Sequence, residues 1–183
     1  MRQQTEVDAR ILTLLDRLSR IIASDDWAGD LNPAQTAALS YLAQANRFSR
    51  SPSVVAEYLG ATRGTVSQTL KALQRKGLIE ESPNPTDKRS ISYKITSKGD
   101  ELARQRRLLN DALNTISTDD RTALLAQLTK VVGSALKARG LKTFGVCRTC
   151  KYHQSDETRP YCRLLDLPLQ AEGADQVCVE QMP

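Results

Sequence analysis

The four cysteines of this 183-residue chain are gathered near its C-terminus. The first two are separated by only two residues, a spacing that lets one turn of the chain direct two thiolates at one metal ion or cluster. The N-terminal residues contain no apolar stretch of the kind that a secretory signal needs. We therefore expect a cytoplasmic protein, in which thiols stay reduced and serve as ligands rather than disulfides. The sequence predicts one metal or cluster site made by Cys147, Cys150, Cys162 and Cys178.

The spacing of these cysteines favours an iron–sulfur cluster over zinc. Zinc ribbons commonly bring two Cys-x2-Cys pairs, whereas Cys162 and Cys178 are separated by fifteen residues. Widely and irregularly spaced ligands are familiar in iron–sulfur proteins, and the basic residues among the cysteines would offset the charge of such a cluster. We expect a cluster of the 4Fe-4S type, with Zn2+ as the alternative. In a zinc site of three cysteines and one histidine, His153 would be the fourth ligand; otherwise it is a polar surface residue.

Composition argues against an enzyme and against a membrane protein. The chain has a single histidine and 40% hydrophobic residues. It has no glycine-rich phosphate loop and no nucleophile elbow. No apolar run approaches the ~20 residues that a membrane-spanning helix needs. A folded, non-enzymatic protein is expected, and a protein-interaction module without DNA binding is one class that composition leaves open.

The positive charge is concentrated in the middle of the chain. The balance of Lys and Arg against Asp and Glu is −1 over residues 1–49, +6 over residues 50–110 and zero over residues 111–183. A basic excess confined to one segment is typical of a surface that meets phosphates.

The two ends of the helical part carry apolar seams that a single small domain cannot cover. Residues 6–24 repeat apolar side chains at helical spacing, and a helix capped by residues 117–120 carries a second seam up to Gly140. A long helix opening at residues 96–99 is expected to contribute a third. Because such seams are too apolar to stay in water, we expect a two-fold homodimer.

The central segment predicts a winged helix-turn-helix. Short helices are expected after Asn32 and Ser51 and again from Thr62 to Lys76, each with N-cap signals. Residues 78–82 and 90–95 then read as two short strands, joined by a basic, turn-rich loop.

The third of these helices presents a face suited to DNA. Its apolar residues fall on one side, and the other side carries short hydrogen-bonding and cationic side chains that read base edges and bind phosphates. A solvated helix face has the same general character, so this helix alone does not settle the matter. The outward residues are Arg63, Thr65, Ser67, Gln68 and Lys71.

Several stretches together resemble the MarR (multiple-antibiotic-resistance regulator) family over roughly residues 5–140. These are the run from Leu31 to Leu42, the run from Ala61 to Ile79, Pro85-Thr-Asp-Lys-Arg-Ser, and the strand that ends in Lys94-Ile-Thr-Ser-Lys-Gly. The resemblance implies a two-fold dimer, held by its first and last helices, that represses transcription at near-palindromic sites on double-stranded DNA. It also implies a wing in which Lys88 and Arg89 contact DNA, with Arg89 in the minor groove, while Asp87 helps to hold the wing. Glu80 and Glu81 stand where the family commonly has a basic residue.

The predicted fold is mainly α with a small β-hairpin wing (α+β), a winged helix-turn-helix flanked by dimerisation helices. The expected parts are an N-terminal dimerisation helix (1–30), the DNA-binding domain (31–96), C-terminal dimerisation helices (97–140) and a small irregular cysteine-rich lobe (141–183). We expect a repressor whose cluster senses redox state, oxygen or iron, acting through the link at residues 140–145 on the packing of the last helices. The alternative is a MarR-like repressor that responds to a small aromatic effector and has a structural zinc lobe.

Overall fold

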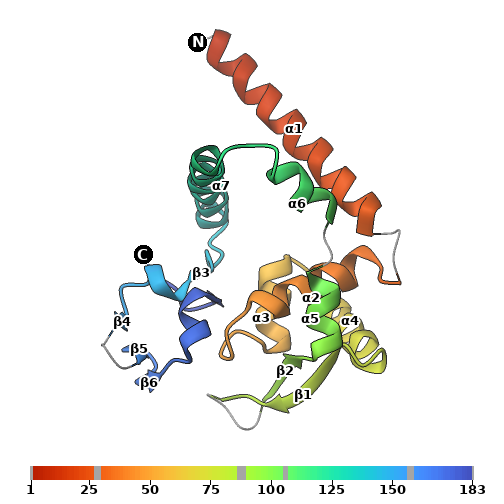
Figure 1. Ribbon diagram of the computed structural model, residues 1–183, viewed down its shortest axis with the longest axis vertical. Coiled ribbons are helices and arrows are strands. Elements are labelled where there is room, and N and C mark those ends of the chain that lie inside the picture. Colours follow the sequence, from red (N-terminus) through yellow and green to blue (C-terminus); the bar gives the residue numbers. More distant parts are fainter. Residues whose placement is uncertain (1, 27–29, 86–89, 105–106, 156–158, 183) are drawn as a thin grey trace.

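The computed structural model describes residues 2–26, 30–85, 90–104, 107–155 and 159–182. It has three parts, visible in Figure 1: a central winged module, helices that extend away from it, and a small C-terminal lobe beside it. The helices are α1 (Arg2–Asp26), α2 (Pro33–Gln44), α3 (Pro52–Leu59), α4 (Arg63–Arg75), α5 (Ser97–Ala103), α6 (Arg107–Leu113) and α7 (Thr118–Ala138). The strands are β1 (Ile79–Pro83), β2 (Ile91–Ile95), β3 (Gly145–Val146), β4 (His153–Ser155), β5 (Pro160–Cys162), β6 (Leu167–Pro168) and β7 (Val177–Cys178). Two 3-10 turns, η1 (Cys147–Thr149) and η2 (Ala171–Asp175), complete the lobe.

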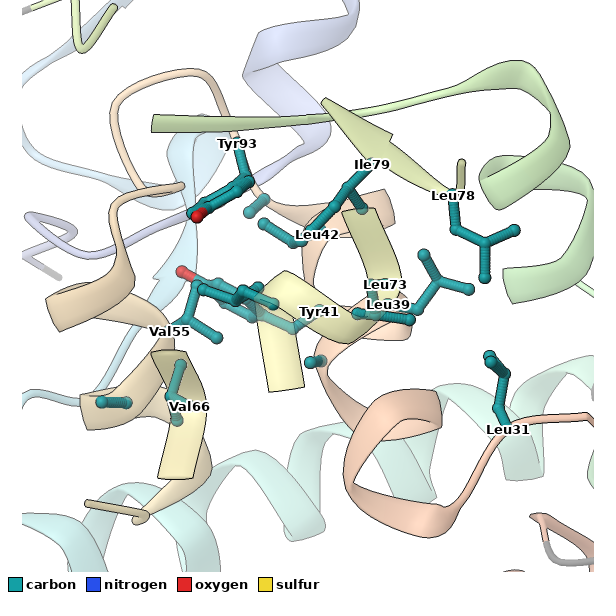
Figure 2. Close-up of a cluster of buried hydrophobic side chains, with 14 residues drawn as sticks. Leu31, Leu39, Tyr41, Leu42, Val55, Val66, Leu73, Leu78, Ile79 and Tyr93 are labelled. Carbon is teal, nitrogen blue, oxygen red and sulfur yellow. The ribbon is translucent and has the colours of Figure 1, made fainter. Parts of the chain in front are cut away.

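The winged module is built around one apolar core, shown in Figure 2. α2 begins with a capping box in which the Asn32 side chain accepts from the Gln35 amide at 2.9 Å. The helix then buries Leu39, Tyr41 and Leu42 against side chains of α3, α4 and the wing. Burial of this many large side chains is what holds α2, α3 and α4 in one arrangement.

The wing is a two-stranded antiparallel sheet at the end of this core. β1 pairs with β2 so that Ile79 lies opposite Ile95 and Pro83 lies opposite Ile91. α5 follows directly, and the close approach of Gly99 to the Leu78 carbonyl leaves no space for a side chain at that glycine. The predicted helix-turn-helix and hairpin are therefore confirmed.

One expected helix is divided. The sequence predicts a single long helix after residue 96, whereas the structure has α5 and α6, with Arg104 capping the first. No glycine or proline marks this break, so the prediction of a single helix was wrong for want of a local signal.

α1 and α7 expose their apolar seams. Leu14 in α1 is 63% exposed and Leu125 in α7 is 68% exposed, and no described side chain of α7 is buried. In Figure 1 α1 extends away from the winged module. Such surfaces are of the kind that a partner covers. Within the described ranges, no helix is long and apolar enough to cross a bilayer.

The C-terminal lobe consists of short strands and tight turns rather than being wholly irregular. β3 pairs with β7, and β4, β5 and β6 form a three-stranded sheet in which His153 lies opposite Cys162. The lobe lies next to α3 in Figure 1. Phe144, which directly precedes β3, packs edge-on against Tyr41 and Tyr58 of the winged module. Its ring centroid lies 6.2 Å from that of Tyr41 and 5.1 Å from that of Tyr58.

Candidate nucleic-acid interface and thiol cluster

α4 is placed by its cap and by its apolar side. The Thr62 hydroxyl accepts from the Thr65 amide at 3.2 Å, and Val66, Leu70 and Leu73 are buried in the module's core. This fixes the rotation of the helix, so that its remaining face lies in solvent. The predicted boundaries of the helix, Thr62 to Lys76, are its N-cap and C-cap in the structure.

The predicted DNA-reading side chains occupy that solvent-facing side. Arg63, Gln68 and Lys71 are exposed, and Ser67 is half-buried. The Thr65 side chain is also exposed, but its hydroxyl lies 2.9 Å from that of Thr62, so the helix cap already engages it. The cations and the amide are therefore the groups most available to a ligand on this face.

The tip of the wing lies outside the described residues. The wing residues that the resemblance singled out, Asp87, Lys88 and Arg89, fall in this range, 86–89. The two acidic residues of β1 are paired within the wing. The Lys94 ammonium lies 3.7 Å from the Glu80 carboxylate, and the Tyr93 hydroxyl donates to Glu81 at 3.4 Å.

Three of the four cysteines lie together in the core of the lobe. Cys147, Cys162 and Cys178 are buried and pack with Leu169 and Phe48. We call the three cysteine side chains the thiol cluster. Phe48 belongs to the winged module, in the loop between α2 and α3, so the lobe completes its core with a side chain from that module. Cys150 is half-buried and adjoins the cluster through the η1 turn.

Hydrogen-bond donors surround the sulfur atoms. The Asn46 amide Nδ2 donates to Cys147 Sγ at 3.7 Å, and the Met182 backbone N–H donates to Cys150 Sγ at 3.4 Å. The hydrogen bond from Cys147 lowers the pKa of Cys178 to about 6, with further donors on Asn46 and on the Glu180 backbone. The same contact, together with burial, raises the pKa of Cys147. Donors of this kind stabilise the charged form of sulfur that metals bind.

The donor chemistry fits a metal or cluster, but the four sulfurs do not converge on one point. Within the ranges that the structure describes, no three His, Cys, Asp or Glu side chains are grouped so as to hold a metal ion. Binding would therefore require the thiol cluster and Cys150 to close on the ion. His153 adds one more donor: its Nδ1 is buried without a hydrogen-bond partner among the described residues, and its backbone lies opposite Cys162.

Sequence reasoning missed the residues that receive the lobe. Asn46 and Ser49 are fully buried polar residues and Phe48 is a buried aromatic, all in one loop of the winged module. Neighbouring Asn, Arg, Phe and Ser residues have no periodicity and carry no motif. The only available signal was a large apolar side chain within an otherwise polar loop.

Comparison with known proteins assigns the module and the fold. Residues 29–90 match the model of the MarR family. Among solved structures, the chain is similar to Staphylococcus aureus MepR bound to DNA, with 22% identity and a TM-score of 0.50 over 70% of this chain and 97% of MepR. It is similar to Streptococcus pneumoniae FabT in complex with DNA, with 20% identity and a TM-score of 0.53 over 70% of this chain and 94% of FabT. It is also similar to apo MarR from Escherichia coli, with 24% identity and a TM-score of 0.51 over 68% of this chain and 96% of MarR.

The comparisons agree with two predictions and leave the lobe unmatched. The similar solved structures confirm the predicted fold, and the family model confirms the predicted resemblance to MarR over residues 29–90. The cysteine lobe lies outside the residues that match the family model. No curated protein matches the sequence.

Proposed function

From the match of residues 29–90 to the MarR family of winged helix-turn-helix transcription regulators, we propose that the protein is a homodimeric repressor. In this proposal the cysteine lobe is a sensor. The dimer binds a near-palindromic operator through two copies of α4. The lobe holds an iron–sulfur cluster on Cys147, Cys150, Cys162 and Cys178. Its state, set by redox conditions, oxygen or iron supply, sets the affinity of the dimer for DNA.

The DNA-binding part of the proposal is supported by the exposed face of α4. Arg63, Gln68 and Lys71 share that face while the opposite side is held in the core, so the helix can enter a major groove without unfolding anything. The dimer is supported by the exposed seams of α1 and α7. A two-fold pair would place the two recognition helices about one DNA turn, ~34 Å, apart.

The sensing part is supported by one observation above all: three thiols are buried together among hydrogen-bond donors in a lobe with few other core side chains. A bound cluster supplies redox chemistry and sensitivity to oxidants. The chain's own groups hold the thiolates, donate to their sulfurs and exclude water through Phe48 and Leu169. A lobe of this size depends on its cofactor for folding, so loss of the cofactor alters how it contacts the module.

The test is anaerobic purification of the parent and of single Cys→Ser variants at the four positions. Iron, sulfide, zinc and DNA affinity are measured on each protein. The proposal expects iron and acid-labile sulfide in the parent, loss of both in each variant, and changed DNA affinity on loss. A cluster whose removal leaves DNA affinity unchanged would contradict the sensing role.

A structural zinc site is the second candidate, and the orphaned His153 Nδ1 favours it. A site of Cys147, Cys162, Cys178 and His153 would satisfy that nitrogen and leave Cys150 free. Stoichiometric zinc without sulfide, retained in Cys150→Ser and lost in His153→Ala, would support this candidate. Retention in His153→Ala with loss in Cys150→Ser would instead indicate four cysteine ligands.

A further inference from the structure

The thiol cluster contacts the DNA-binding module directly, through the loop of residues 45–51 between α2 and α3. Asn46 and Ser49 in this loop are 1% and 0% exposed, and each makes hydrogen bonds to the lobe. The Asn46 backbone N–H donates to the Val177 carbonyl at 2.9 Å, and the Val179 N–H donates to the Ser49 hydroxyl at 2.9 Å. The two residues on either side of Cys178, Val177 and Val179, are therefore both hydrogen-bonded to this loop.

Asn46 joins the loop to the sulfur atoms themselves. Its Nδ2 donates to Cys147 Sγ, while its Oδ1 accepts from the Phe48 amide at 3.1 Å and from the Ser49 hydroxyl at 2.8 Å. One side-chain amide thus connects the state of the thiols to the shape of the loop. A sulfur that becomes a metal-bound thiolate is a stronger acceptor than a thiol, so the bond from Asn46 differs between the two states.

The other side of the loop holds the elements that meet DNA. The Ser49 carbonyl accepts from the buried Tyr41 hydroxyl at 2.7 Å, and the Arg50 carbonyl accepts from the Tyr93 amide in β2 at 3.1 Å. Ser51 is the N-cap of α3. A shift of this loop would therefore reach α3, which packs on α4, and the base of the wing together.

The link at residues 140–145 is less suited to carry such a shift. Phe144 is stacked against Tyr41 and Tyr58, so the chain between α7 and the lobe is fixed to the winged module before it enters the lobe. The route through the packing of the last helices, expected from the order of segments in the sequence, passes this anchored point. The loop contacts bypass it.

From these contacts we infer that the loop of residues 45–51 transmits the state of the thiol cluster to the DNA-binding module, with Asn46 as the positioning residue between sulfur and loop. This inference rests on the proposed sensing function. It requires that the loop differ between metal-bound and metal-free protein, because coupling exists only where contacts differ between states.

The experiment measures the DNA affinity of each protein in a metal-loaded and a metal-free form. The loaded form is reconstituted anaerobically with iron and sulfide, or with Zn2+ if the parent holds zinc. The metal-free form is prepared with a chelator. The probe is a labelled duplex that the parent protein selects from a random-sequence pool. The ratio of the two dissociation constants is the coupling, and couplings of about 5- to 150-fold are typical. The test variants are Asn46→Asp, which keeps the oxygen acceptor and removes the amide donor, and Asn46→Ala.

The matched controls separate this contact from the rest of the interface. Arg47→Ala removes a hydrogen bond of 2.9 Å to the Pro168 carbonyl, in the same loop but away from the sulfurs. Insertion of two glycines between Leu141 and Lys142 loosens the link to α7. If the inference holds, both controls keep the parent's ratio of dissociation constants. In both Asn46 variants this ratio falls to within about threefold of one, while the metal content stays unchanged.

Two further readouts distinguish transmission from mere stability. Hydrogen exchange at residues 46–50 and at Tyr93 should differ between the two forms of the parent, and this difference should vanish in Asn46→Asp. Loss of an N–H donor to sulfur should also lower the reduction potential of an iron–sulfur cluster, or shift the thiolate charge-transfer band of the Co2+-substituted site.

The outcomes separate this inference from the proposed function. A parent ratio of one contradicts sensing itself. A parent ratio that both Asn46 variants retain, with metal bound, overturns the loop as the route while leaving sensing intact. If the Asn46 variants fail to hold metal, Ser49→Ala and the glycine insertion decide between the two routes. A ratio of dissociation constants that stays at the parent's value in Ser49→Ala but falls to one in the insertion variant overturns the inference. A ratio that falls to one in Ser49→Ala but stays at the parent's value in the insertion variant supports it.

Discussion

The side-chain amide of Asn46 donates to the sulfur of Cys147, which lies 101 positions further along the chain. Asn46 lies near the start of the loop that follows α2 in the winged module, and Cys147 opens the Cys-x2-Cys turn of the lobe. The unmatched lobe is therefore not a tail attached to the end of a MarR-type module. It is built onto the module's own helix-turn-helix, and its core includes the module's Phe48.

Removal of the cations on α4 should weaken DNA binding without affecting folding. Arg63→Ala and Lys71→Ala each delete an exposed charge on the face opposite the core. Each lost phosphate contact should lower the slope of log affinity against log salt by about 0.9. Lys130→Ala, an exposed cation on α7, is the control and should leave both affinity and slope unchanged. Parent-like binding by both α4 variants in a salt titration would contradict the proposed docking of this helix.

The wing should contribute separately from α4. Arg89→Ala is expected to reduce DNA affinity and the salt slope, because the resemblance places this arginine in the minor groove. The same duplex and salt titration measure it, and Lys94→Ala, which removes the partner of Glu80 within the wing, serves as control. Equal affinity for the Arg89 variant and the parent would remove the wing from the interface.

A charge in the α1 seam should dissociate the dimer. Leu14 is 63% exposed in the isolated chain, so an aspartate there costs little in a monomer but would be buried without a partner in the dimer. Sedimentation of Leu14→Asp should show the monomer, while thermal unfolding of the winged module stays close to the parent's. Thr13→Asp, on the neighbouring exposed position, adds the same charge outside the seam. A Leu14→Asp protein that still sediments as a dimer would exclude this seam from the interface.

The winged module could be predicted from sequence because its signals are local. The helix caps at Asn32 and Thr62 each act within a few residues, and the structure has both. The family resemblance then supplied their order. The division between α5 and α6 has no such local signal and was missed.

The surface on which the lobe packs could not be predicted, because it depends on contacts between residues that are distant in the sequence. The Ser49 hydroxyl meets the Val179 amide 130 positions away, and neither residue belongs to a periodic pattern or a motif. The cysteine spacing drew attention to the lobe, and Cys147, Cys162 and Cys178 lie together in its core. Spacing could not reveal that a loop of the winged module would pack against them.

Substitution of Gly99 should destabilise the junction between the wing and α5. A Cβ at this position would lie 2.1 Å from the Leu78 carbonyl oxygen and 2.9 Å from an Ile95 carbon, so the backbone of β1 or α5 must move. Overpacking of this kind costs about 1–3 kcal/mol, seen as a lower denaturation midpoint for Gly99→Ala. Gly64→Ala is the matched control, since the nearest atom to its added Cβ is 4.0 Å away. Equal stability of the two variants would contradict the close approach.

Truncation of Phe48 should release the thiols. Phe48 is 7% exposed, packs against the buried cysteines and Leu169, and lies under the Arg47 guanidinium at 4.7 Å. Phe48→Ala removes an aromatic core side chain, a change that typically costs about 3–5 kcal/mol. If that cost falls on docking of the lobe, the population of undocked lobe rises by roughly a hundredfold to a few thousandfold. In metal-free reduced protein, a thiol reagent should then modify the three buried cysteines faster by a similar factor, while half-buried Cys150 changes least. Leu164→Ala, an apolar truncation at a position 40% exposed in the same lobe, should leave the rates unchanged. If Phe48→Ala also leaves them unchanged, the winged module does not cover the thiols in solution.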